Sequence, residues 1–292
     1  MSTATGISKG TLYVVGTPIG NLRDISLRAL EVLAAVDYIA AEHIQSAQKL
    51  LAAHAVPTAY TQLIALHQHN EVQSADKIIA LLAANQTVAI IADAGTPTIS
   101  DPGALLIQRV RAQRFPVIPV PGANAALCAL SASGLIAPHF LFYGFLPTKS
   151  GERQRKLADL KTLYACILVF YEAPHRVLEC VADMTTVFGS AREITFAREL
   201  TKLFETVHSC ALGDALDWLQ ADKNHLRGEF VLLLAPEEKP EQGEISPQAV
   251  QTLAILQKTL PLKQAVQLAA EITGESRNKL YARALLEQKL ET

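Results

Sequence analysis

The sequence has no excess of positive charge. Its 26 lysines and arginines are balanced by 28 aspartates and glutamates, which gives a formal net charge of −2 over 292 residues. Proteins that bind nucleic acid over a broad surface usually carry an obvious basic excess, because the cations neutralise the phosphates that they contact. Any contact of this chain with a polyanion is therefore expected to be confined to a local patch.

Cysteine is scarce and irregularly spaced. The chain has four cysteines, none of them in a Cys-x-x-Cys pair: Cys128, Cys166, Cys180 and Cys210. The spacing therefore predicts neither a structural zinc site nor a disulfide framework, and four reduced thiols are expected. No acidic or cysteine ligand set accompanies His67 and His69, so we predict no metal site there either.

Long hydrophobic runs are missing as well. The longest, such as Ala165–Tyr171 and Phe230–Ala235, are far shorter than the roughly 20 residues that a helix needs to cross a bilayer, and they indicate buried strands. The segment Met1–Gly10 lacks the basic start and apolar stretch of a signal peptide. We therefore expect no membrane association, no export and a cytoplasmic location.

The usual phosphate-binding signatures are absent from the first predicted strand-to-helix turn. Gly16-Thr17-Pro18-Ile19-Gly20 has neither the G-x-G-x-x-G spacing nor the Gly-Lys-Ser/Thr of a P-loop. Its proline fixes one backbone angle and removes a hydrogen-bond donor, which suits a rigid turn at the edge of a cleft. A dinucleotide or nucleoside triphosphate site is therefore not predicted at this turn.

Half of the residues are hydrophobic, and the hydrophobic pattern along the chain changes after about residue 135. Residues 1–135 alternate short apolar runs with amphipathic stretches, which predicts an α/β domain around a mostly parallel sheet. The expected strands are Leu12–Val15, Tyr38–Ala41, Leu63–Leu66, Val88–Ala92 and Val117–Val120. The expected helices are Ser26–Val36, Ser46–His54, Glu71–Ala84, Ala104–Ala112 and Ala123–Ser133.

Residues 136–236 are richer in strands and predict a second, α+β domain with a mixed sheet. Its expected strands are Phe140–Phe145, Cys166–Tyr171, Ile194–Arg198, Glu205–Ser209 and Glu229–Leu234, and its expected helices are Glu152–Leu163, Pro174–Phe188 and Ala211–Gln220. A Pro/Glu/Gly-rich linker over 237–245 follows. Residues 246–292 predict a small tail of three short helices resembling a helix-turn-helix unit, with six cations against four carboxylates.

The densest motif is Asp93–Gly103, directly after an apolar strand. It holds two glycines, two prolines and two aspartates in eleven residues, so its backbone conformation is closely specified. One interpretation is a helix entry with Asp101 as N-cap and Pro102 at the first helical position. The other is a ligand-binding loop, because open α/β sheets bind ligands at the carboxyl ends of their strands. The two interpretations are compatible.

Six segments together resemble the tetrapyrrole-methylase-like (class III) S-adenosylmethionine methyltransferases, and among them the bacterial 16S ribosomal RNA (cytidine-2′-O)-methyltransferases. The segments are Leu12–Leu22, Asp93–Gly103, Pro121-Gly122, Gly144–Pro147, Tyr171–Arg176 and Ala197–Lys202. The resemblance covers residues 12 to about 290. It implies a homodimer of two-domain α/β subunits that binds S-adenosylmethionine between the domains and methylates a cytidine ribose of 16S ribosomal RNA in the decoding region of the small subunit.

The resemblance also implies site residues. The cofactor contacts would be Pro18, Gly95, Thr96, Ile99, Ser100, Asn124, Ala125, Tyr171, Glu172 and Ala197. The sequence does not identify the base that accepts the ribose proton, and the candidates in cleft motifs are Glu42, His69, Glu172, Glu199 and Lys202. The segment His69-Asn70-Glu71 is expected either to face substrate or to form an exposed loop with Asn70 as N-cap.

One segment departs from the family pattern. Members usually read Glu-Asp-Thr-Arg after the second strand, where this chain reads Glu42-His43-Ile44-Gln45. Two alternatives therefore stay open beside the RNA methyltransferase. The first is a methyltransferase that acts on a tetrapyrrole or another small molecule. The second is a paralogue that has lost catalysis and binds only cofactor or RNA.

The near-neutral charge requires a local RNA-binding rim. The strongest candidate is the stretch from Lys149 to Lys161, which carries five cations against two carboxylates. A solvated helix face is the other interpretation of this stretch. The predicted RNA-contacting cations are Arg23, Lys149, Arg153, Lys156, Arg176, Arg198 and Lys202.

Overall fold

The computed structural model describes residues 6–57, 61–237 and 245–290. Its first sheet has five parallel strands in the order β3-β2-β4-β1-β5. The strands are β1 (Leu12–Val15), β2 (Tyr38–Ala41), β3 (Gln62–Ala65), β4 (Val88–Ile91) and β5 (Val117–Val120). The mostly parallel sheet that the sequence predicts is therefore confirmed, with three of the strand ranges matched at both ends.

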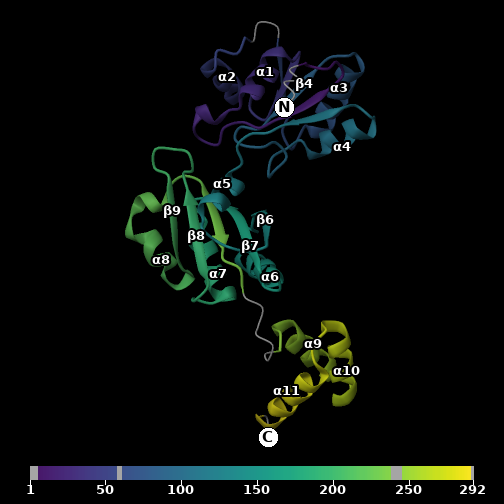
Figure 1. The fold of residues 1–292 in the computed structure, drawn as a ribbon, viewed down its shortest axis with the longest axis vertical. Coiled ribbons are helices and arrows are strands. Elements are labelled where there is room, and N and C mark those ends of the chain that lie inside the picture. The colour runs from purple at the N-terminus through teal and green to yellow at the C-terminus, as the bar shows by residue number, and fades with distance from the viewer. Residues whose placement is uncertain (1–5, 58–60, 238–244, 291–292) are drawn as a thin grey trace.

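Helices cover both faces of this sheet (Figure 1). The helices that follow the strands are α1 (Leu27–Ala35), α2 (Ile44–Ala53), α3 (Glu71–Ala83) and α4 (Ala104–Ala112), with a short 3-10 turn at Leu22–Asp24. Val32 and Leu33 of α1 pack in one core, whereas Leu106 and Val110 of α4 pack in the core on the opposite face. Because β1 and β4 are neighbours whose following helices lie on opposite faces, the loops after them diverge and leave room for a ligand.

The second sheet is mixed and has the order β6-β7-β10-β8-β9. Its strands are β6 (His139–Phe145), β7 (Cys166–Glu172), β8 (Glu193–Arg198), β9 (Thr206–Ala211) and β10 (Phe230–Leu234). Strands β6 and β7 are parallel, and the other pairs are antiparallel. One face packs against α6 (Ser150–Leu160), α7 (Val177–Phe188) and α8 (Leu212–Ala221), and a 3-10 turn at Lys223–Leu226 follows α8.

Helix α5 (Ala125–Ala132) covers the other face of the second sheet. Its buried Ala126 and Ala129 share a core with Val169 of β7 and Val231 of β10. The division at residue 135 follows the change in sequence pattern, but packing places α5 with the second sheet. The chain therefore crosses between the sheets at the turn before α5, and this crossing brings that turn to the space between them.

The tail forms three helices with a core of its own. They are α9 (Pro247–Gln257), α10 (Leu262–Thr273) and α11 (Arg277–Leu290), and Figure 1 shows them as a separate unit beyond the second sheet. Ser246 caps α9, and Gly274 ends α10 in the left-handed conformation. Most of the predicted linker, residues 238–244, lies outside the described residues. In the described part of the chain, no helix is both long and apolar enough to cross a membrane.

Candidate active site

The loops after β1, β4 and β5 are held together by their backbones. A Cβ atom on Gly122 would lie 2.8 Å from backbone atoms of Gly16, so only glycines permit this approach. Thr17 N donates to Gly95 O at 2.8 Å, and Gly95 N donates to Thr17 O at 3.1 Å. The Thr17 hydroxyl also donates to Ala92 O at 3.1 Å. These contacts fix the floor of a cleft at the carboxyl ends of the parallel strands.

A cavity of about 300 Å³ opens between this floor and the second sheet. Its lining comes from both domains and includes nine of the ten residues that the sequence predicts as cofactor contacts: Gly95, Thr96, Ile99, Ser100, Asn124, Ala125, Tyr171, Glu172 and Ala197. Pro18 is not among the lining residues, and its neighbour Ile19 takes that place. The structure therefore brings the predicted residues to one cavity from segments up to about a hundred residues apart.

An aromatic wall closes one side of the cavity. The ring of Tyr171 lies 4.8 Å from that of Phe142 and 5.7 Å from that of Phe145, both in edge-to-face geometry. The Tyr171 hydroxyl accepts a hydrogen bond from Ala126 N at 3.3 Å, which ties α5 to β7. Burial raises the pKa of Tyr171, so this hydroxyl stays protonated. The wall is suited to packing against a planar or cationic group.

Four of the eight non-glycine residues with positive φ in the described part of the chain lie in two loops beside the cavity. Thr98 and Ser100 of the loop after β4 have φ of 74° and 68°, and Glu199 and Thr201 of the loop after β8 have φ of 52° and 65°. Residues other than glycine rarely adopt such angles, and for the β-branched threonines the cost is highest. The surrounding contacts must hold these loops in place, as the Thr201 hydroxyl does by accepting a hydrogen bond from Asn21 N at 3.0 Å.

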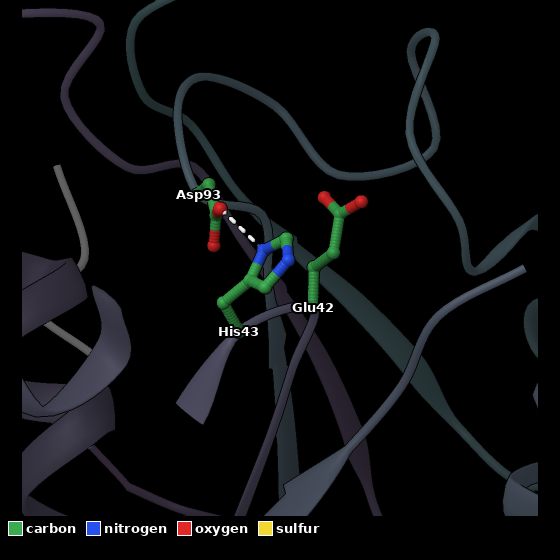
Figure 2. Close-up of side chains that lie close together, drawn as sticks. All are labelled: Glu42, His43 and Asp93. Atoms are coloured by element: carbon green, nitrogen blue, oxygen red, sulfur yellow. Dashed lines mark hydrogen bonds and ion pairs between the residues drawn. The ribbon is translucent and has the colours of Figure 1, made fainter. Parts of the chain in front are cut away.

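The segment that departs from the family pattern ends β2 beside the end of β4. His43 Nδ1 lies 2.7 Å from Asp93 Oδ2, and Glu42 completes the group shown in Figure 2. Potential ligand atoms of the three side chains lie within 4.8 Å of one another. A cation can be shared at such distances, but His43 and Asp93 already satisfy each other, so we assign no metal here. The sequence did not predict this grouping because it depends on the pairing of β2 with β4.

Comparisons with known proteins assign the chain to a family. The family model described as Tetrapyrrole (Corrin/Porphyrin) Methylases matches residues 11–216. The chain belongs to this family of methylases. A second model, described as the RsmI C-terminal HTH domain, matches residues 243–289 and so covers the three tail helices.

Relatives of this methylase match it over almost their whole length. The chain is 47% identical to "Ribosomal RNA small subunit methyltransferase I" of Pseudomonas aeruginosa over 283 residues, which cover 97% of this chain and 99% of that protein. The protein of the same name in Escherichia coli O157:H7 is 45% identical, with 96% of each chain covered. The family membership that the sequence motifs predicted is therefore confirmed.

Solved structures of other methyltransferases share its fold. The methyltransferase CobJ superposes with a TM-score of 0.58 at 17% identity and covers 78% of this chain and 94% of that chain. Uroporphyrin-III-C-methyltransferase from Thermus thermophilus gives a TM-score of 0.55 at 20% identity, covering 78% and 94%. The predicted fold class, two α/β domains of the tetrapyrrole methylase type, is confirmed.

Two of the predicted base candidates in this methylase are held in an ion-pair network. Lys202 Nζ lies 2.8 Å from both Glu199 Oε1 and Glu229 Oε2. Burial acts to raise the pKa of Glu199, but the hydrogen bond from Lys202 and that from Glu229 N outweigh it and hold the pKa below its usual range. Burial likewise acts to lower the pKa of Lys202, and its two carboxylate partners reverse this effect. Both groups stay charged, which makes them poor proton acceptors.

The carboxylate of Glu172 is turned away from solvent. Its side chain has no exposed surface, and Oε1 accepts a hydrogen bond from Ala173 N at 2.8 Å and lies 3.2 Å from Arg176 Nε. Glu172 lines the cavity, and its other oxygen, Oε2, is buried without a hydrogen-bond partner among the described residues. A role for Glu172 as the base stays a prediction.

In the segment His69-Asn70-Glu71, the histidine is exposed, whereas the other two side chains make hydrogen bonds within the protein. His69 is exposed, and its ring lies 6.0 Å from that of His67. Asn70 precedes α3 but makes no capping bond, and its Oδ1 instead accepts from His67 N at 2.8 Å. Glu71 Oε1 accepts from Gly103 N, Leu105 N and Leu106 N at 2.8–3.2 Å. The expectation that Glu71 faces substrate is wrong, because Glu71 caps α4.

Asp101 lines the cavity, although the sequence favoured a role for it as the N-cap of a helix. The N-cap position of α4 is occupied by Gly103, whose φ is 120°, so the interpretation of Asp101 as N-cap is wrong. Asp101 instead lines the cavity. Burial, followed by the nearby charges of Glu42 and Asp93, raises the pKa of Asp101 to about 6. The sequence placed Asp101 in its densest loop motif, but the burial and the neighbouring carboxylates that raise its pKa arise only in the folded chain.

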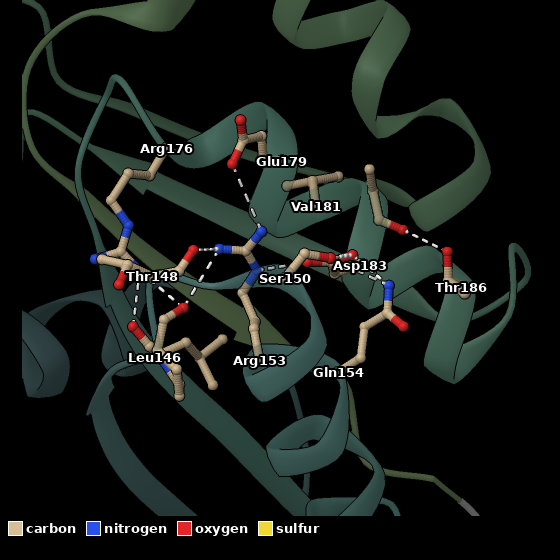
Figure 3. A network of polar contacts seen from close by, with 12 residues as sticks. Leu146, Thr148, Ser150, Arg153, Gln154, Arg176, Glu179, Val181, Asp183 and Thr186 are labelled. Carbon is tan, nitrogen blue, oxygen red and sulfur yellow. Dashed lines mark hydrogen bonds and ion pairs between the residues drawn. The ribbon is translucent and has the colours of Figure 1, made fainter.

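The predicted RNA-contacting cations fall into two groups. Arg153 is only 1% exposed and donates from Nε to Asp183 Oδ2 at 2.6 Å and from Nη1 to Thr148 O at 3.0 Å (Figure 3). Arg198 is 6% exposed and donates to the carbonyls of Arg227 and Phe204. The expectation that these two arginines reach RNA is therefore wrong, because both are buried and donate hydrogen bonds to other parts of the protein.

The remaining cations differ in exposure. Arg23 is exposed, and the side chains of Lys149 and Lys156 are 81% and 54% exposed, with weak ion pairs of 3.6 Å along α6. Arg176 is mostly buried and donates to Leu146 O at 2.7 Å, next to its contact with Glu172. Arg23, Lys149 and Lys156 therefore remain the members of the predicted set that are free to meet a polyanion.

Proposed function

We propose that this chain transfers a methyl group from S-adenosylmethionine to the ribose 2′-hydroxyl of a cytidine in the decoding region of 16S ribosomal RNA. The observation that carries the proposal is the match to ribosomal RNA small subunit methyltransferases over 96–99% of their length, tail included. The tetrapyrrole enzymes of the same fold are 20% identical or less and cover 77–78% of this chain. A tetrapyrrole acceptor is therefore not favoured.

The cavity suits S-adenosylmethionine. Its volume of about 300 Å³ lies at the lower end of the range for small-molecule sites. A Cβ on Gly95 would lie 3.3 Å from Ile19 Cγ2, so the glycine leaves a space at the cavity wall that a larger residue would fill. The aromatic ring of Tyr171 complements a cationic sulfonium. Gly95, Thr96, Ile99, Ser100, Asn124, Ala125, Tyr171 and Ala197 would hold the cofactor.

Positioning supplies most of the catalysis in such a reaction. The bound cofactor supplies an activated methyl group, so the protein must hold the acceptor oxygen close to it and in line with the leaving sulfur. The loops that line the cavity are fixed by backbone contacts and are therefore preorganised. Arg23, Lys149 and Lys156 are exposed cations that can bind the phosphates of the RNA.

A transfer assay tests the proposal. Small subunits from cells that lack the modification are incubated with labelled S-adenosylmethionine and the protein, and the labelled nucleotide is mapped. We expect one 2′-O-methylcytidine in the decoding region, and no transfer by Gly95→Val, whose side chain fills the cavity. Cofactor binding without transfer to the subunit would contradict the proposal and support a small-molecule acceptor or a chain without catalysis.

We expect the reaction to take place in the cytoplasm, where ribosomal subunits are assembled.

We also propose that the protein is a homodimer. Exposed apolar side chains of the second domain support self-association: Ile136 is 91%, Leu203 89% and Phe204 68% exposed. Burying such side chains is a common driving force for dimers. Sedimentation equilibrium should give twice the chain mass of 31.5 kDa, whereas a mass equal to one chain at micromolar concentration would contradict the dimer.

A further inference from the structure

We infer that Asp101 is the general base that accepts the proton of the ribose hydroxyl. The inference rests on the proposed function, since it names the proton acceptor of that reaction. Three acidic residues line the cavity: Asp101, Glu172 and Glu229. Glu172 Oε1 lies 3.2 Å from Arg176 Nε, and Glu229 Oε2 lies 2.8 Å from Lys202 Nζ, so each of these two carboxylates has a cation beside it.

Asp101 differs from both because it has no cation beside it. In the described part of the chain its carboxyl makes no hydrogen bond and no ion pair. A half-buried carboxyl at a cavity wall without a partner loses solvation and gains nothing from the fold, which is typical of functional groups. The adjoining Ser100 is held at a φ of 68°, and a Cβ on Gly144 would lie 3.1 Å from its hydroxyl, so the loop that carries Asp101 is packed against β6.

The groups that face Asp101 favour its protonated form. Glu42 at the end of β2 and Asp93 at the end of β4 are carboxylates, and Tyr171 of β7 is a phenol that burial keeps neutral. A base with a pKa of about 6 is ionised at neutral pH and still accepts a proton readily, which is the range that general catalysis requires. His43 contacts Asp93 at 2.7 Å and so positions the Asp93 carboxylate near Asp101.

The chemical step is balanced with Asp101 as acceptor. The ribose 2′-oxygen forms a bond to the donated methyl carbon as the bond from that carbon to sulfur breaks. The sulfonium becomes a neutral thioether, and the hydroxyl proton moves to the Asp101 carboxylate, from which it passes to water. Charge is conserved, because one cation and one carboxylate are converted to two neutral groups.

The test is the pH dependence of single-turnover transfer to unmodified small subunits by the full-length protein. The wild-type rate should rise with pH to a plateau, with a midpoint near 6. Asp101→Asn should lower the plateau by about 10²–10⁴-fold and abolish the midpoint while the affinity for S-adenosylmethionine stays within threefold. Asp101→Glu should restore part of the rate. Asp217→Asn, an exposed site on α8, is the matched control and should leave the profile unchanged.

A second variant tests separately whether neighbouring carboxylates raise the proton affinity of Asp101. Glu42→Gln removes one of the two carboxylates that raise the proton affinity of Asp101, so its midpoint should move to lower pH by up to about one unit. A midpoint that persists in Asp101→Asn, an Asp101→Asn rate within threefold of wild type, or a midpoint that Glu42→Gln leaves in place overturns the inference. Absence of transfer by the wild type at every pH would instead overturn the proposed function.

Discussion

Arg153 carries its charge at 1% exposure, and Asp183 accepts from Arg153 Nε, Ser150 Oγ and Gln154 Nε2 at 2.6–2.9 Å (Figure 3). Burial acts to raise the pKa of Asp183, but these hydrogen bonds outweigh it and hold the pKa below its usual value. Removing one partner of such a pair leaves the other charge buried and unpaired, which is far more costly than losing a surface ion pair.

The first prediction follows from this network. Arg153→Ala should lower the free energy of unfolding by about 3–5 kcal/mol at pH 7, because Asp183 would be left without its main partner. Urea denaturation followed by circular dichroism measures the change. Arg155→Ala, an exposed neighbour on α6, is the control and should change stability by less than about 0.5 kcal/mol. Equal effects of the two substitutions would contradict the structural role of Arg153.

The second prediction concerns the stability cost of Asp101. Its pKa lies above the value in an unfolded chain, so the folded state binds more protons and stability falls as the pH rises from about 4 to about 6. Asp101→Asn removes this cost and should raise the free energy of unfolding at pH 7.5 by about 1 kcal/mol, after allowance for solvent screening at a half-buried site. The gain should vanish near pH 3.5. A variant less stable than wild type at pH 7.5 would contradict the expected destabilising environment.

At the scale of single elements, the loops after β1 and β5 owe their positions to Gly16 and Gly122. Gly122→Ala would place a Cβ 2.8 Å from the Gly16 backbone, so the loops must separate. We expect about 1–3 kcal/mol of destabilisation and at least a tenfold loss of affinity for S-adenosylmethionine, measured by isothermal titration calorimetry. Gly151→Ala meets no neighbour within 4 Å and is the control. Unchanged cofactor affinity in Gly122→Ala would show that this contact does not shape the cleft.

Periodicity predicted the elements well because each strand is short, apolar and followed by an amphipathic helix. The range of α4, Ala104–Ala112, was predicted at both ends although its cap was not. The cap comes from Glu71, which lies 33 residues before the helix and reaches it only in the folded chain. Sequence patterns are local, so contacts made across the fold, such as this cap and the Glu42–His43–Asp93 group, were not predicted.

The same limit explains the errors in the basic helix. Arg153 and Lys156 lie three residues apart in one charged stretch, and composition alone does not separate them. Their positions on the helix separate them, because Arg153 lies on the buried face of α6 with Leu157. Asp183 on α7 accepts its hydrogen bond. Two of the predicted RNA contacts were therefore structural arginines, whereas nine of the ten residues predicted as cofactor contacts, carried by long motifs, line one cavity.

At the scale of the whole molecule, a net charge of −2 means that the proposed RNA binding would depend on a few exposed cations. The double variant Lys149→Glu and Lys156→Glu should weaken binding to unmodified small subunits by at least tenfold at low salt. The slope of log affinity against log salt should also become shallower, since fewer phosphate counterions are released. Filter binding at several potassium concentrations measures both. An unchanged slope would exclude the α6 face from the RNA interface.

The described part of the chain has two sheets, a cavity between them and a separate helical tail, and its relatives are named for ribosomal RNA. The most direct measurement of the central claim is a ribose-methylation map of 16S ribosomal RNA from the host with the gene deleted, and again with it restored. The account predicts that one 2′-O-methylcytidine in the decoding region disappears on deletion and returns with the wild-type gene but not with Gly95→Val. A map that is identical with and without the gene would contradict it.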